Sequence, residues 1–218
     1  GCIVAPPESG KSRLMRSCVE WSIGQDPNIA VLLIQNTARQ ANLQVAAIAN
    51  VLTSDKYQKV FPHVKATERW SGEKIFIERD TMRPDATLAG YGIDGPYQGA
   101  HVDMLVIDDP TAQKDVYSEV VMQSQRDLIK GVLFDRLMEN GQYCVIFTRW
   151  GDNDLLQTIE EDIKVPIHTY PAYRDEEYDW GSKYLWEFQY SEERLKEQER
   201  AKGPDLFKLS YLCSASGA

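Results

Sequence analysis

The chain has 218 residues, of which 43% are hydrophobic and 26% are charged, and its formal net charge is −9. This length and composition suit one sizeable globular domain with its own core, and no apolar stretch approaches the roughly 20 residues that a membrane-spanning helix needs. The acidic balance argues against a surface covered in basic residues for nucleic acid, although a local basic patch can still contact DNA.

The predicted elements alternate between short apolar runs, typical of buried strands, and longer stretches with helical spacing. In chain order, strands are expected at residues 3–4, 29–34, 74–79, 86–91, 104–107, 143–147 and 165–168. Helices are expected at residues 11–24, 38–53, 116–138 (as one helix or two) and 191–202. Asp152 is expected to cap a further helix that runs to about residue 161.

Strands that are apolar throughout and separated by helices indicate an α/β fold in three layers, with a mostly parallel central sheet and helices on both faces. The segments 74–79 and 86–91 are expected to pair as a hairpin. Beyond Pro171 the chain is acidic and aromatic with weak periodicity. We therefore expect a single domain over 1–218, with a core at about 1–170 and a C-terminal extension at 171–218.

The four cysteines are widely scattered, and no pair has the spacing of a metal site or of a CxxC motif. We expect thiols in a reducing compartment, buried at Cys2 and Cys144, rather than a disulfide or a zinc site. The chain begins inside an apolar run and closes on small residues at 214–218. Both ends suggest one domain of a longer protein.

A phosphate-binding loop (Walker A motif) is predicted at residues 5–12, which read Ala-Pro-Pro-Glu-Ser-Gly-Lys-Ser between a strand and a helix. Gly10 lets the backbone approach phosphate, Lys11 reaches the β- and γ-phosphates, and the Ser12 hydroxyl ligates Mg²⁺. Ala5 replaces the usual first glycine, and a Gly-Lys-Ser at a helix start can arise by chance. The predicted nucleotide-binding residues are Pro7, Glu8, Ser9, Gly10, Lys11, Ser12 and Arg13.

An acidic pair follows the apolar run 104–107 and is read as a Walker B motif. Asp108 is expected to hold Mg²⁺, and Asp109 is expected to polarise the attacking water as a general base. The carboxyl end of a parallel strand is where such groups belong. An Asp-Asp-Pro turn is common on its own, but together with the upstream loop it indicates a P-loop NTPase of the RecA-like (ASCE) class, an ATPase or a GTPase. An acid directly after the metal-binding Asp108 favours an ATP-driven motor.

A third strand, at 143–147, runs into Thr148-Arg149-Trp150. If this strand lies beside the Asp108 strand, Thr148 and Arg149 point toward the γ-phosphate and can couple phosphate loss to movement. Taken by itself, the pattern favours an incidental arginine at a strand end.

In their order along the chain, these residues resemble the ATPase domain of the large terminase subunit of tailed bacteriophages. The likeness spans nearly the whole chain, and its most discriminating part is the acidic pair with Thr148-Arg149-Trp150. The matching stretches are residues 5–12, 90–95, 98–103 leading to 105–110, 135–137, 148–155, 171–172 and 207–211.

The resemblance implies a motor that uses ATP and Mg²⁺ to package double-stranded DNA into proheads in the host cell cytoplasm. It implies a ring of subunits on the portal protein, with a small terminase subunit that selects the DNA. Full-length relatives also carry a C-terminal nuclease domain and an adenine-contacting segment before the first strand. This chain is expected to lack both.

The chain departs from the family pattern at two positions. Glu8 stands where many relatives have a basic residue, and Gln98 stands where an arginine often completes a neighbour's site as an arginine finger. Either the finger comes from elsewhere, with Arg136 and Arg149 as the candidates, or the site is weak. Two other functions remain open: a helicase-like DNA translocase, and a P-loop binding module that nucleotide merely switches.

Overall fold

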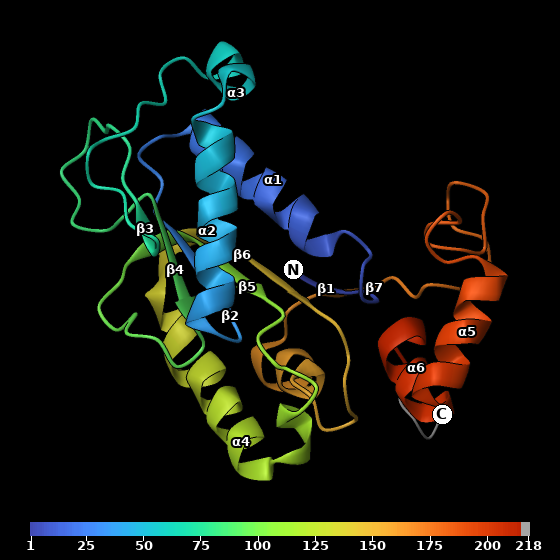
Figure 1. Cartoon of the computed structure of the whole chain (residues 1–218). Coiled ribbons are helices and arrows are strands. Elements are labelled where there is room, and N and C mark those ends of the chain that lie inside the picture. Colours follow the sequence, from blue (N-terminus) through green and yellow to red (C-terminus); the bar gives the residue numbers. More distant parts are fainter. Residues whose placement is uncertain (215–218) are drawn as a thin grey trace. The chain divides into compact units, whose positions relative to one another are not determined.

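The computed structural model describes residues 1–214 (Figure 1). The small-residue tail that suggested a cut end continues into residues 215–218, which lie outside the described part. In the described part, no helix is both long enough and apolar enough to cross a bilayer.

Seven strands form a sheet in the order β3-β4-β2-β5-β6-β1-β7. The pairs β1–β6, β1–β7, β2–β4 and β2–β5 are parallel, and β3–β4 is antiparallel. The predicted α/β fold with a mostly parallel sheet is therefore confirmed. The strands are β1 (Cys2–Val4), β2 (Val31–Gln35), β3 (Lys74–Ile75), β4 (Leu88–Gly92), β5 (Val102–Asp108), β6 (Leu137–Phe147) and β7 (Ile167–Thr169).

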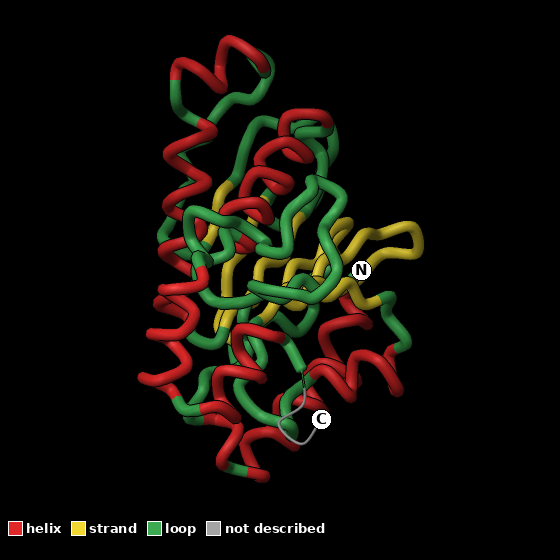
Figure 2. Tube along the Cα trace, turned by 90° about the vertical axis from the view of Figure 1, so that its right-hand side faces the viewer, coloured by secondary structure: helices red, strands yellow, loops and turns green. Residues whose placement is uncertain are grey.

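Helices separate β1 from β2, β2 from β3 and β5 from β6, whereas β3, β4 and β5 follow one another along the chain. Figure 2 shows the helices in red and the strands in yellow. The α-helices are α1 (Lys11–Gln25), α2 (Ala38–Leu52), α3 (Asp55–Val60), α4 (Glu119–Leu128), α5 (Glu192–Lys202) and α6 (Pro204–Leu212). Shorter helical turns are η1 (Asp115–Tyr117), η2 (Ile129–Leu133), η3 (Phe134–Arg136) and η4 (Thr158–Ile163).

The contacts within the chain divide it into two compact units. Unit 1 comprises Gly1–Lys11, Thr111–Arg126 and Val145–Ala218, and unit 2 comprises Ser12–Pro110 and Asp127–Cys144. The expected single domain with an extension from residue 171 stays a prediction.

Unit 2 is built around β2, which pairs with β4 on one side and β5 on the other. All five residues of β2 are buried, as its continuous apolar sequence predicts. Helix α2 lies against β4 and β2. It begins after Thr37, whose hydroxyl accepts a hydrogen bond from the Gln40 amide.

Unit 1 places β1 between the end of β6 and β7. Its C-terminal part pairs α5 with α6, which lie side by side. A small apolar cluster joins the two helices to the chain before them and consists of Ala172, Tyr190, Leu195, Phe207 and Tyr211. This cluster gives the C-terminal segment a core of its own.

Most of the expected elements are present, with several corrections. The expected hairpin is shorter than predicted, because β3 spans only Lys74–Ile75 where it pairs antiparallel with β4, and helix α3 was not predicted. The strand expected at 143–147 is the end of a longer strand, β6, and the helix expected over 116–138 breaks into α4, η2 and η3. Helix α6 was not predicted as a separate element. The helix expected from Asp152 to about residue 161 is the shorter η4 (Thr158–Ile163), whose N-cap position is Gln157 and not Asp152.

All four cysteines are free thiols in the described structure, so no disulfide forms there. Cys2 and Cys213 are buried, Cys144 is half-buried and Cys18 is exposed. The expected burial is thus confirmed for Cys2 and is only partial for Cys144.

Gly92 provides a test of the α2–β4 packing. A Cβ atom at Gly92 would lie 2.7 Å from the backbone nitrogen of Ala38, at the start of α2. We expect Gly92→Ala to lower the free energy of unfolding by about 1–3 kcal/mol, because the helix backbone must shift.

The matched control is Gly72→Ala, because a Cβ at Gly72 meets no atom within 4 Å. Urea denaturation followed by circular dichroism compares the two variants. Equal stability of both variants would show that α2 and β4 do not approach as closely as described.

Candidate active site

The loop between β1 and α1 has the backbone of an anion-binding turn. Glu8 and Gly10 both adopt left-handed conformations, with φ of 61° and 82°. Space around the Cβ position of Gly10 is open, so this glycine is needed for its backbone conformation and not for close packing. Helix α1 begins at the next residue, Lys11, and presents its first amide N–H groups, which favour a bound phosphate.

Lys11 meets the end of β6 within unit 1. Its Nζ donates to Thr148 Oγ1 over 2.7 Å and lies 3.5 Å from the carbonyl oxygen of Pro6. Thr148 is buried and directly follows the last residue of β6. The structure therefore joins two residues that the sequence placed in separate motifs.

Ser9 carries a polar atom that needs a partner. Its Oγ is buried and makes no hydrogen bond to any residue that the structure describes. A buried hydroxyl without a partner costs about 1–3 kcal/mol. A phosphate oxygen in the loop would satisfy this hydroxyl, so the loop fits the triphosphate group it is expected to hold.

The predicted metal ligands meet within unit 2. Ser12 Oγ donates to Asp108 Oδ1 over 2.9 Å. The other carboxylate oxygen, Oδ2, accepts from Gln35 Nε2 over 2.6 Å. The Asp108 side chain is fully buried at the end of β5, so these hydrogen bonds determine how its carboxylate is oriented.

The oxygen donors of Ser12 and Asp108 suit Mg²⁺, which binds through one or two protein ligands together with substrate phosphates and water. Among the described residues, no three or more histidines, cysteines or carboxylates gather in a way that could hold a metal ion. A site of this kind needs no such cluster, because nucleotide and water supply the remaining ligands.

Asp109 sits in an unusual turn directly after β5. Its φ is 45°, in the left-handed region that non-glycine residues seldom adopt. Asn36 Nδ2 donates to the carbonyl oxygen of Pro110 over 2.9 Å and so ties the turn to the end of β2. Such conformations persist where the surroundings enforce them, often at functional sites.

Arg149 is engaged within unit 1. Its Nε donates to Asp154 Oδ2 over 2.9 Å, and only 8% of Arg149 and 3% of Asp154 are exposed. Burial raises the pKa of the Asp154 carboxyl, and the charge of Arg149 offsets part of that rise. In this conformation Arg149 faces its own chain and not solvent. Trp150, the next residue, is half-buried.

Three further residues singled out in the sequence lie in unit 2. Arg136 ends η3 and is half-buried. Gln98 is exposed between β4 and β5, and Arg13 is exposed in the first turn of α1.

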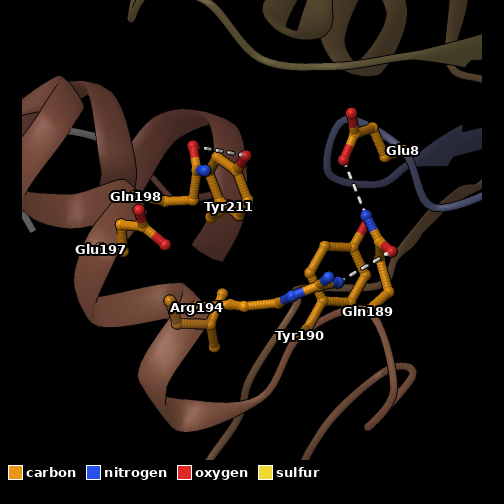
Figure 3. Close-up of a pocket in the computed structure, with 8 residues that line it drawn as sticks. Glu8, Gln189, Tyr190, Arg194, Glu197, Gln198 and Tyr211 are labelled. Carbon is orange, nitrogen blue, oxygen red and sulfur yellow. Dashed lines mark hydrogen bonds between the residues drawn. The ribbon is translucent and has the colours of Figure 1, made fainter.

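A further contact, which the sequence did not predict, holds the phosphate loop. The Tyr190 hydroxyl donates to the carbonyl oxygen of Pro7 over 2.5 Å, and Gln189 Nε2 donates to Glu8 Oε2 over 2.7 Å (Figure 3). Burial raises the pKa of Tyr190, so its hydroxyl stays protonated and remains a donor. The residues before α5 thereby fix the backbone of the loop.

The side chains of Glu8, Gln189 and Tyr190 line a cavity of about 290 Å³ in unit 1. Its wall includes Glu8 from the loop, Arg194 from α5 and Tyr211 from α6. Arg194 Nη1 donates to Gln189 Oε1 over 3.3 Å. Figure 3 shows Gln189 between Glu8 and Arg194. The side chains of Gln189 and Arg194 thus connect the phosphate loop at Glu8 to helix α5.

No protein-family model and no curated protein sequence matches the chain. Two solved structures of the large terminase ATPase domain of Thermus phage P74-26 are similar to it. An arginine-to-alanine variant of that domain aligns with a TM-score of 0.59 at 17% identity, over 98% of this chain and 88% of the other. The domain without that substitution aligns with a TM-score of 0.56 at 16% identity, over 98% and 87%.

At this level of identity the likeness concerns the fold. The resemblance drawn from the motifs is thus supported by a comparison that uses backbone geometry over nearly the whole chain. The chain has the α/β fold of the ATPase domain of a phage large terminase subunit.

Proposed function

We propose that the chain is the motor domain of a viral large terminase subunit, which hydrolyses ATP to drive double-stranded DNA into proheads. The observation that carries the proposal is the hydrogen bond between Ser12 Oγ and Asp108 Oδ1. It joins the last residue of the phosphate loop to the acid at the end of β5. The terminase-like fold gives this pair the setting of a motor.

The triphosphate of ATP is held by the loop from Pro7 to Arg13. The loop amides, the Ser9 hydroxyl and the Lys11 ammonium group bind the phosphates, and the Lys11 contact with Thr148 positions that ammonium group in the free protein. Ser12 and Asp108 would hold Mg²⁺, which, when bound, neutralises charge on the phosphates.

Asp109 is the proposed general base. It directly follows Asp108, the proposed metal ligand, and its left-handed backbone ends the extended strand there. Hydrolysis needs a carboxylate that accepts a proton from water as the water attacks the γ-phosphate. Thr148, Arg149 and Trp150 are proposed to relay phosphate loss to movement of the domain, because Thr148 contacts Lys11.

Arg136 is the better candidate for an arginine finger. A finger that acts in a neighbouring subunit must reach beyond its own surface, and Arg149 is buried against Asp154. Arg136 is half-buried and ends a short helical turn. Arg149 then acts within its own chain, in coupling.

The wider setting follows from the same proposal. The motor works in the host cell cytoplasm as a ring on the portal protein of the prohead, and the small terminase subunit delivers the DNA. A nuclease domain in the full-length protein cuts the DNA. A helicase-like translocase shares the loop and the acids, so packaging by the full-length protein is the assay that separates the two.

Substitution of Lys11 or Asp109 by alanine tests the catalytic roles. We expect Lys11→Ala to abolish steady-state ATP hydrolysis and Asp109→Ala to lower its rate by about 10²–10⁴, the usual contribution of general base catalysis. Asp109→Ala should still bind a fluorescent ADP analogue, since the loop is intact. The control is Lys59→Ala, at an exposed position on α3.

Near-normal turnover in Asp109→Ala would refute the general-base assignment. Nucleotide binding by the unsubstituted protein without any turnover would instead favour a nucleotide-switched binding module. DNA added to the unsubstituted protein should raise its turnover.

The finger assignment predicts that catalysis needs a neighbouring subunit. The specific ATPase rate should rise steeply with protein concentration, and Arg136→Ala should lower turnover by about 10³–10⁵. Mixing Arg136→Ala with Asp109→Ala protein should restore part of the activity, because an Asp109→Ala subunit supplies Arg136 to a neighbour whose base is intact. A rate independent of concentration, with no recovery on mixing, would contradict a finger from another subunit.

A further inference from the structure

We propose that Gln35 is a positioning residue for the metal-binding carboxylate of Asp108. Resting on the proposed function, this inference adds a residue that none of the sequence motifs contains. Gln35 is the last residue of β2 and is 6% exposed. Its side chain is therefore held inside unit 2, where the Asp108 carboxylate lies.

The register of the sheet places the two side chains together. Strands β2 and β5 are parallel, and Ile34 pairs with Ile107. Gln35 and Asp108 each come one residue later, and paired residues of parallel strands direct their side chains to the same face of the sheet. The 2.6 Å hydrogen bond from Gln35 Nε2 to Asp108 Oδ2 follows from this register.

The two carboxylate oxygens of Asp108 have different partners. Gln35 binds Oδ2 and Ser12 binds Oδ1, so rotation about the Asp108 side chain would break both hydrogen bonds. The oxygen beside Ser12 is thereby directed to the place where Ser12 would bind Mg²⁺. Partners of a ligand residue that fix its orientation commonly account for 10–100-fold in metal affinity.

The chemistry of an amide suits this role. Glutamine donates a hydrogen bond without carrying a positive charge, so the full negative charge of Asp108 remains available to a cation. Lysine or arginine at the same place would compete with the metal, and a carboxylate would repel Asp108.

A second amide, from the residue that follows β2, supports the same turn. Asn36 Nδ2 donates to the carbonyl oxygen of Pro110 over 2.9 Å. The last residue of β2 and the residue after it therefore hold the Asp108 side chain and the backbone two residues further along. The end of β2 is thus built to fix the acidic turn in position.

The test separates metal binding from catalysis. A fluorescent ADP analogue is titrated against the chain with Mg²⁺ and, separately, with EDTA. The dissociation constant in EDTA divided by that in Mg²⁺ is the metal gain, the factor by which metal tightens ADP binding. The affinity of the ADP complex for Mn²⁺ is measured by electron paramagnetic resonance. We expect Gln35→Leu to lower the metal gain and the Mn²⁺ affinity by about 10–100-fold, with ADP affinity in EDTA changed less than twofold.

Two further variants keep the test decisive. Gln35→Glu keeps the side-chain size but replaces the donor by an acceptor. The gain in ADP affinity from metal should therefore fall at least as far as in Gln35→Leu. This variant takes the place of Gln35→Leu if that protein does not fold. Gln58→Leu is the matched control, because Gln58 Nε2 binds the carbonyl oxygens of Leu52 and Val64, away from Asp108. It should lower stability and leave the metal gain unchanged.

The outcomes are distinct. If the unsubstituted chain shows a metal gain and folded Gln35→Leu and Gln35→Glu show the same gain, the positioning role is refuted and the proposed function stands. If the unsubstituted chain shows no metal-dependent nucleotide binding, the proposed function itself fails. A loss of metal gain in both variants and not in Gln58→Leu supports the inference.

Discussion

The hydrogen bond between Ser12 and Asp108 is the contact on which the functional reading depends. It connects the start of α1, where the phosphate loop ends, to the carboxyl end of β5. A phosphate loop without an acid beside it can bind an anion but has no ligand set for a metal. An acidic strand end without the loop is an ordinary turn. Only their meeting allows one site to hold both the triphosphate and its cation.

Each unit holds its own residues of the candidate site in place. Within unit 2, the parallel pairing of β2 with β5 brings Gln35 to the carboxylate and Asn36 to the turn that follows it. Within unit 1, Tyr190 binds the loop backbone at Pro7, and Thr148 binds Lys11. Both sets of partners are neutral, so they orient the charged groups without cancelling the charge that substrate and metal require.

Much of this arrangement could be predicted from sequence, because the signals were local. The loop lies between a strand and a helix, and Asp108 ends a continuous apolar run, so their place at strand ends follows from composition. Gln35 could not be identified in the same way, since its role depends on which strand neighbours β5. The strand order places β2 there, and no local pattern around Gln35 encodes it.

The same limit explains the other differences. Tyr190 is separated from Pro7 by most of the chain, so nothing near either residue indicates their hydrogen bond. Helix α6 has only nine residues, of which Phe207, Leu209, Ser210 and Tyr211 are buried, so its sequence is too short to show a clear helical repeat.

The most direct test of the account is a double-mutant cycle on Ser12→Ala and Asp108→Asn, read as the gain in ADP affinity that Mg²⁺ provides. Both side chains are held to bind one ion, so either substitution should remove most of the gain and the second should add little. The two effects should then depart from additivity by roughly 0.5–3 kcal/mol. Effects that simply add, or a gain that survives both substitutions, would contradict a shared metal site at the end of the phosphate loop.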